Sequence, residues 1–195
     1  MIKKYFLKFI LPGVILMLTS SLSAQKLAVK TNLLYDATAT LNAGFETGLS
    51  PKWTLDVSGN YNGWNMSSCG CRKWKHWMVQ PEARYWFCER FNGHFLAMHA
   101  LGGQYNMAKV HLPFGLYPGL RKNRYEGWFA GAGVGYGYQW VLNKRWNFEA
   151  EIGVGYVYTD YKTYRCSQCP KRTDRGHKNY LGPTKAALTL VYVIN

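Results

Sequence analysis

The stretch WTLDVSGNY at residues 53–61 alternates apolar and polar side chains at almost every step, and WNFEAEIGV at residues 146–154 repeats the rhythm. Successive side chains of a β-strand point to opposite faces, so this period predicts strands with one apolar and one polar face. Aromatic residues lie near the ends of such segments and carboxylates nearer their centres. That combination is typical of a closed barrel with lipid outside and a polar interior.

The N-terminus has the three-part layout of a secretory signal peptide. Three lysines precede an apolar run at residues 9–18, and small residues follow as far as Ala24. We expect cleavage after Ala24, so that 1–24 is a signal peptide and 25–195 is the mature domain. A membrane-anchor helix is the alternative, but this run is shorter than the ~20 residues that such a helix needs. Any membrane residence of the mature chain is therefore expected to come from strands.

Eight strands account for the mature chain. We predict them near residues 26–37, 41–49, 53–62, 77–87, 94–106, 126–141, 146–159 and 183–194. Short connections alternate with long ones at 63–76, 107–125 and 160–180. Outer-membrane barrels have short periplasmic turns and long outer loops. The sequence thus predicts an all-β fold, an eight-stranded antiparallel transmembrane β-barrel in the outer membrane of a Gram-negative bacterium.

The side chains that should point inward form a polar network in the lumen. Its members are Lys30, Glu46, Asp56, Glu82, Arg84, Glu149, Glu151 and Lys185. Buried carboxylates need partners, which the three basic side chains can supply. An eight-stranded barrel is just wide enough to be filled by side chains. This favours a salt-bridged plug, with a proton path or a narrow channel as the alternatives.

Two strands fit the pattern badly, and one inner face is unusual. Pro81 would remove a ladder hydrogen bond from the fourth strand, so we expect a bulge there. The strand at 94–106 has no clean alternation, and its faces cannot be assigned. Four alternate glycines at 131–137 share the inner face with Phe129 and Gln139, where they would admit curvature and large facing side chains.

Aromatic residues are expected to form two belts at the membrane interfaces. One belt lies toward the short turns and the other toward the long loops. Their members are Trp53, Phe87, Phe95, Trp140 and Trp146, and Trp64, Trp74, Trp77, Trp128 and Tyr158. A soluble sandwich or lipocalin-like barrel, the alternative, would turn such aromatic residues inward and its carboxylates toward solvent.

The formal net charge is +14, and its distribution is more informative than its total. Once the signal peptide is removed, the three long segments carry the whole basic excess. The candidate anion-binding residues are Arg72, Lys73, Lys75, Arg121, Lys122, Arg124, Arg165, Lys171, Arg172 and Arg175. A nucleic-acid binder would seldom have a signal peptide and amphipathic strands. Contact with lipopolysaccharide, other outer-membrane lipid or an acidic surface protein is the better interpretation.

Four cysteines lie in two of the long segments. Cys69 and Cys71 are in the first, and Cys166 and Cys169 are in the last. Export to an oxidising compartment favours disulfides, either between the two segments or locally between Cys166 and Cys169. Four thiolates could instead bind zinc. Connectivity stays open.

A lipid-modifying barrel enzyme is a further alternative. His99 is the only histidine within a strand core, and Ser58 and Asp56 lie elsewhere on the barrel. Neither GxSxG nor HExxH accompanies them, so we predict no catalytic residue, no cofactor and no enzymatic function.

Several motifs resemble a Bacteroidetes family of small outer-membrane barrels of unknown function. They are residues 30–37 (KTNLLYDA), 53–56 (WTLD), 102–106 (GGQYN), the glycine-rich sixth strand and the 144–147 turn (KRWN). The resemblance implies an eight-stranded barrel, sometimes encoded near fimbrial or surface-adhesin components. With the charge pattern, it indicates a non-enzymatic barrel with basic, cysteine-containing outer loops for surface interaction and envelope structure, the partner being lipopolysaccharide or a surface or fimbrial protein.

Overall fold

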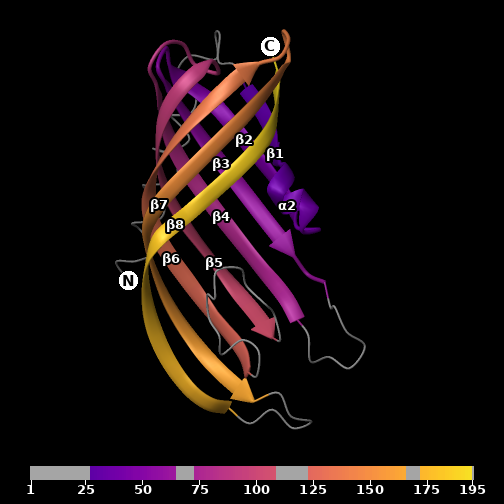
Figure 1. Ribbon diagram of the computed structural model, residues 1–195, viewed down its shortest axis with the longest axis vertical. Helices are drawn as coiled ribbons and strands as arrows, with labels where there is room; N and C mark the ends of the chain where they lie inside the picture. The colour runs from indigo at the N-terminus through magenta and orange to yellow at the C-terminus, as the bar shows by residue number, and fades with distance from the viewer. Residues whose placement is uncertain (1–26, 65–72, 109–122, 166–171, 195) are drawn as a thin grey trace, which may run out of the picture.

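The computed structural model describes residues 27–64, 73–108, 123–165 and 172–194. It is an all-β structure with one short helix. The elements are β1 (Leu27–Asn32), α2 (Leu33–Ala37), β2 (Leu41–Ser50), β3 (Trp53–Asn62), β4 (Lys73–Trp86), β5 (Gly93–Ala108), β6 (Asn123–Val141), β7 (Trp146–Arg165) and β8 (Arg172–Ile194). Every strand pairs antiparallel with the next, and β1 pairs with β8, so that the sheet closes into a barrel (Figure 1). The predicted eight antiparallel strands are confirmed.

Strands β6, β7 and β8 are longer than the sequence predicted. The segment 160–180, predicted as a loop, instead mostly continues β7 and β8, which remain paired as far as Tyr164 and Arg172. Figure 1 shows this part of the sheet reaching well beyond α2 and the end of β3. The prediction was wrong because these residues are polar on both faces, and polar composition without alternation is typical of loops.

The predicted first strand, 26–37, ends early. Its last residues form α2, with the Asn32 side chain accepting a hydrogen bond of 3.1 Å from the Leu34 amide as an N-cap. Thr38 closes the helix by donating its amide to Tyr35 O, and Ala39 turns the chain at a φ of 53°. No helix of the described segments is long and apolar enough to cross a membrane.

Burial alternates along β5 even though its composition does not. Phe95, Ala97, His99 and Leu101 are buried, whereas the residues between them are exposed. Three of these inward residues are apolar, so both faces of β5 carry apolar side chains. This is why the sequence did not reveal which face points inward.

The bulge predicted at Pro81 is absent from β4. The pairing of β4 with β3 keeps one register, in which Pro81 lies opposite Val57. The pairing of β4 with β5 has the same register before and after Pro81, where Val79 pairs with Gly102 and Glu82 pairs with His99. Pro81 itself has no pairing partner on β5. The strand tolerates proline here because its missing backbone N–H would have faced this unpaired position. Register shifts lie elsewhere in the described sheet, and one of them is in β8, where Thr184 is an extra residue opposite β7.

Candidate functional site: the buried ion-pair cluster

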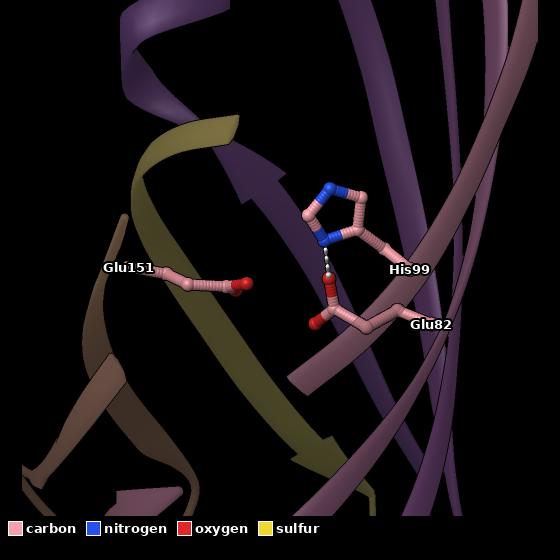
Figure 2. A group of neighbouring side chains, drawn as sticks. All are labelled: Glu82, His99 and Glu151. Atoms are coloured by element: carbon pink, nitrogen blue, oxygen red, sulfur yellow. Dashed lines mark ion pairs between the residues drawn. The ribbon is translucent and has the colours of Figure 1, made fainter. Parts of the chain in front are cut away.

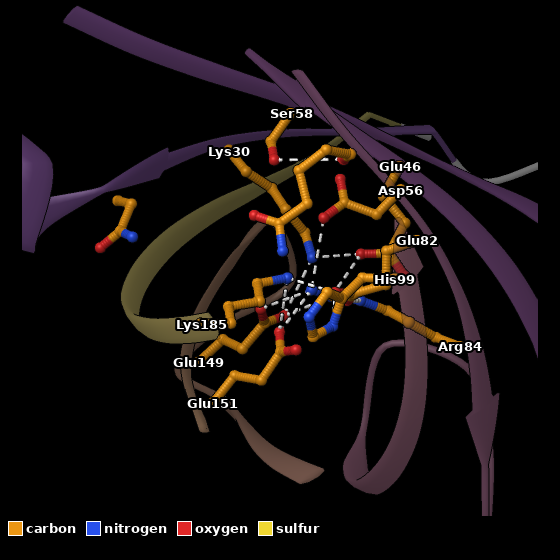
Figure 3. Close-up of polar contacts among 12 residues, drawn as sticks. Lys30, Glu46, Asp56, Ser58, Glu82, Arg84, His99, Glu149, Glu151 and Lys185 are labelled. Carbon is orange, nitrogen blue, oxygen red and sulfur yellow. Dashed lines mark hydrogen bonds and ion pairs between the residues drawn. The ribbon is translucent and has the colours of Figure 1, made fainter. Parts of the chain in front are cut away.

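All eight residues of the predicted polar network meet inside the barrel (Figure 3). They come from β1, β2, β3, β4, β7 and β8, and each lies on the inward-facing side of its strand. Period-two alternation brings them together because a closed ring gathers every inward side chain around one axis. The structure thus brings together every residue that the sequence assigned to the polar interior.

Arg84 is the centre of the cluster, and its side chain is 1% exposed. Its Nε lies 2.5 Å from Glu82 Oε1, and its two Nη atoms reach four more carboxylates. Those distances are 3.0 Å to Glu46, 3.3 Å to Asp56, 2.8 Å to Glu149 and 2.9 Å to Glu151. A guanidinium presents five donors in a fixed fork, which suits such multiple contacts.

Two lysines complete the network. Lys30 Nζ pairs with Glu46 and lies 2.9 Å from Glu149 Oε2. Lys185 Nζ lies 2.5 Å from Glu82 Oε2 and 3.0 Å from Glu151 Oε2. Five carboxylates thus face three cationic side chains, so this buried group of residues has an excess of negative charge when all five carboxylates are ionised and His99 is neutral.

His99 lies at one side of the cluster, with its ring next to the Glu82 carboxylate, and Glu151 points toward the pair from the opposite side (Figure 2). It is 3% exposed, and its Nε2 lies 2.9 Å from Thr184 Oγ1 on the bulge of β8. Its Nδ1 is 3.8 Å from Glu82 Oε2 and has no hydrogen-bond partner. The imidazole fits because Gly153 faces it, where an added Cβ would lie 2.9 Å from His99 Cε1.

An apolar layer borders the cluster toward the short turns. Trp86 and Phe95 are fully buried with ring centroids 4.8 Å apart, and Arg84 lies over the Phe95 ring at 4.6 Å. The Trp86 indole donates to Thr54 Oγ1 at 2.9 Å, and Phe91 packs with Val191 nearby. Sequence analysis missed Trp86 and placed Phe95 wrongly in an outer aromatic belt. Trp86 follows Arg84 by two residues on β4 and therefore lies on the same inward face. This spacing was the signal in the sequence that could have revealed it.

Other residues of the predicted aromatic belts are exposed, unlike the buried Phe95. Trp53, Trp140 and Trp146 near the short turns, and Trp77 and Trp128 near the long connections, all have exposed side chains. Aromatic neighbours pack along this outer surface, for example Trp128 against Tyr158 with centroids 5.6 Å apart. Large apolar and aromatic side chains therefore face outward at both ends of the barrel.

The predicted anion-binding residues are only partly described. Lys75, Arg124 and Arg175 have placed side chains, while Lys73, Arg165 and Arg172 are described as strand residues alone. Outside the described residues lie Arg72, Arg121, Lys122 and Lys171, together with Cys69, Cys71, Cys166 and Cys169. The disulfide and zinc alternatives for these cysteines therefore stay predictions.

A groove of about 430 Å³ lies near the ends of β3–β7 that adjoin the long connections. Lys75 and Lys162 line it together with Trp77, Trp128 and two acidic residues, Glu126 and Asp160. Arg175 on β8 lies next to the groove, because it pairs in register with Lys162. Its Nη2 lies 2.9 Å from Asp160 Oδ2. Hydrogen bonding from Arg175, reinforced by the charges of Arg175 and Lys162, lowers the pKa of Asp160 below its ordinary value.

His99 does not meet Ser58 as the lipid-enzyme alternative would require. Its ring nitrogens face Thr184 and Glu82, whereas Ser58 Oγ donates to the Gln80 carbonyl at 3.4 Å. The enzymatic alternative thus gains no catalytic constellation from these residues.

The fold and its interior define a class of protein: a closed antiparallel β-barrel with a charged core and an apolar exterior. A family model described as "Protein of unknown function (DUF3575)" matches residues 10–194, so the chain belongs to this family. Comparisons with curated proteins and with solved structures gave no match. The resemblance to a family of unknown function is confirmed, while the Bacteroidetes origin and the link to fimbrial components stay predictions.

Proposed function

We propose that this protein is a non-enzymatic outer-membrane barrel that spans the bilayer and binds anionic glycolipid at its outer rim. The observation that carries the membrane placement is the inverted distribution of polarity. Val134, Ile152 and Leu181 are 56%, 64% and 82% exposed, whereas Arg84 is 1% exposed. Apolar side chains outside and charges inside are what a bilayer favours and what water disfavours.

The interior has a structural role in this proposal. Arg84 and its carboxylates occupy the lumen, and the Trp86–Phe95 layer fills the adjoining section. Removing one partner from such a buried group of paired charges is costly, because the remaining carboxylates lose their counter-charge. The cluster and the aromatic layer would together lock the barrel in one register and close it to solutes, which argues against the channel alternative.

The outer rim supplies the interaction surface. Lys75 and Lys162 line a groove next to Trp77 and Trp128, and Arg175 is adjacent. Exposed aromatic rings favour the level of lipid headgroups. Basic side chains just beyond them suit the phosphate groups of lipopolysaccharide, which carry the negative charge of the outer leaflet.

Binding of purified, refolded protein to vesicles tests this function. We expect association with vesicles that contain lipopolysaccharide, weak association with phosphatidylcholine alone, and loss as salt is raised, because the Debye length falls from ~10 Å at 0.1 M to ~3 Å at 1 M. The variant Lys75→Gln, Lys162→Gln, Arg175→Gln should bind more weakly.

A matched control removes the same number of charges at the opposite end of the barrel, with Lys52→Gln, Lys144→Gln and Arg145→Gln. The control should bind as the native protein does. Equal binding by both variants would contradict the glycolipid proposal and would direct the search toward an acidic surface or fimbrial protein. Recovery of the mature chain in the soluble periplasm would contradict the membrane placement itself.

A further inference from the structure

Three potential metal ligands converge at one buried point inside the barrel. One ligand atom from each of Glu82, His99 and Glu151 lies within 4.8 Å of the other two (Figure 2). We propose that these residues form a binding site for one divalent transition-metal ion of the zinc class. An imidazole with carboxylates is a donor set that such ions accept.

Two of these donor groups have buried atoms without hydrogen-bond partners. His99 Nδ1 and Glu151 Oε1 are buried and make no hydrogen bond, although polar atoms in a protein interior almost always do. His99 is held by the contact of its Nε2 with Thr184 Oγ1 at 2.9 Å. When Nε2 donates to that oxygen, Nδ1 presents its lone pair to the carboxylates, which is the form that binds a metal.

The charge of the cluster points to the same ligand. Five carboxylates surround Arg84, Lys30 and Lys185, so when all five are ionised two negative charges are not matched by the lysines and the arginine. A buried charge without a counter-charge is unfavourable. A divalent cation in place of the Lys185 ammonium would reduce this excess, and His99 would join it as a neutral ligand.

Lys185 is the internal competitor for this site. Its ammonium lies 2.5 Å from Glu82 Oε2 and 3.0 Å from Glu151 Oε2, where a metal ion would also be bound. Its side chain is more exposed than those of the two carboxylates, so it is the member of this group that a metal ion could displace toward solvent. Zinc bonds of ~2.0–2.2 Å require the three donors to draw closer than they are now, and releasing Lys185 permits that movement.

Titration of the refolded full-length protein with Zn²⁺ and Co²⁺ tests the proposal. We expect one equivalent to bind, with a Co²⁺ spectrum of nitrogen and oxygen ligands. His99→Ala should abolish this binding, and Lys185→Met should tighten it by about tenfold or more because the competing ammonium is gone. His94→Ala, which changes a histidine on the outer surface, is the matched control and should bind as the native protein does.

Several results would overturn the proposal. One is the absence of Zn²⁺ binding to both the native protein and Lys185→Met. Another is binding that survives His99→Ala. A third is a Co²⁺ spectrum with thiolate charge transfer, which would assign the metal to the cysteines of the outer segments. If Lys185→Met refolds poorly, refolding with Zn²⁺ against Mg²⁺ decides the question, since a ligand of the native state raises its yield and thermal stability. Equal yields with both ions would also contradict the site.

Discussion

Arg84 and Glu149 form a two-pronged ion pair across the interior of the barrel. Nη1 lies 2.8 Å from Glu149 Oε2, and Nη2 lies 3.0 Å from Oε1. Strands β4 and β7, which carry the two residues, are not neighbours in the sheet. The pair therefore ties together two walls that backbone hydrogen bonds do not join, and its parallel geometry is the strongest form of such a contact.

Replacement of Arg84 by Met should destabilise the barrel strongly. The variant leaves several buried carboxylates without their common partner, and breaking a buried pair in this way costs ~3–5 kcal/mol. Urea unfolding in detergent or lipid vesicles measures the loss. Arg145→Met is the control, because Arg145 is exposed at a turn and bonds only weakly to Tyr192 at 3.3 Å. The control should change the free energy of unfolding by ~0.5 kcal/mol or less. A similar loss in both variants would contradict the central role of Arg84.

Val57 and Ser58 test the two faces of one strand. Val57 is exposed on the outside of β3, and Ser58 points inward toward β4. If Val57 is near mid-membrane, Val57→Arg should cost ~2–4 kcal/mol in lipid. Ser58→Arg depends on lumen packing and should respond little to bilayer thickness. Unfolding of both variants in bilayers of different thickness is the measurement, and identical behaviour would contradict the proposed lipid-facing surface.

Gly153 should not tolerate a methyl group. A Cβ there would lie 2.9 Å from His99 Cε1 and 3.2 Å from Lys185 Cβ. Overpacking of this kind costs ~1–3 kcal/mol, so Gly153→Ala should lower the unfolding midpoint. Gly59→Ala is the control, since nothing lies within 4 Å of its added Cβ. The crowding argument fails if Gly59→Ala is as unstable as Gly153→Ala.

Much of the fold could be predicted because a barrel wall has only two sides. Charge alone identifies the inward face of a strand. Asp56 alternates with Val57, and Glu149 and Glu151 flank Ala150, so the charged side chains must point inward. Once the faces are set and the strands are taken in order, ring closure brings Lys30, Arg84 and Glu149 to one place. The two-residue alternation thus predicted which residues form the cluster. It did not predict the distances between them or the central position of Arg84.

The helix, the lengths of the strands and the bulge in β8 could not be predicted from the alternation of apolar and polar residues. Leu33 and Leu34 break the alternation, but only the Asn32 cap and the turn at Ala39 show that a helix replaces the strand. The lengths of β7 and β8 follow from backbone pairing, which polar residues such as Asp160 join as readily as apolar ones. The position of Thr184 beside His99 depends on a bulge that shifts the register by one residue.

Asp160 should have a measurably low pKa because Arg175 holds its ionised form. Arg175 donates to Asp160 Oδ2 at 2.9 Å, and this hydrogen bond is the largest cause, ahead of the positive charges of Arg175 and Lys162. We expect ¹³C NMR of the carboxyl group to give a pKa below its ordinary value of 3.8, and Arg175→Gln to raise it toward that value. Lys52→Gln, at the opposite end of the barrel, should leave it unchanged.

The sign of the shift sets the pH at which this contact matters. A carboxyl group with a lowered folded-state pKa stabilises the fold at pH values above its unfolded pKa, and the contribution disappears as the pH falls through the lowered folded value. The contact that holds Arg175 next to the groove should therefore be complete at neutral pH and lost only in strong acid. Between neutral pH and pH 5, Asp160→Asn should change glycolipid binding equally at every pH. A pH-dependent difference between Asp160→Asn and the native protein in that range would show that Asp160 is not held ionised.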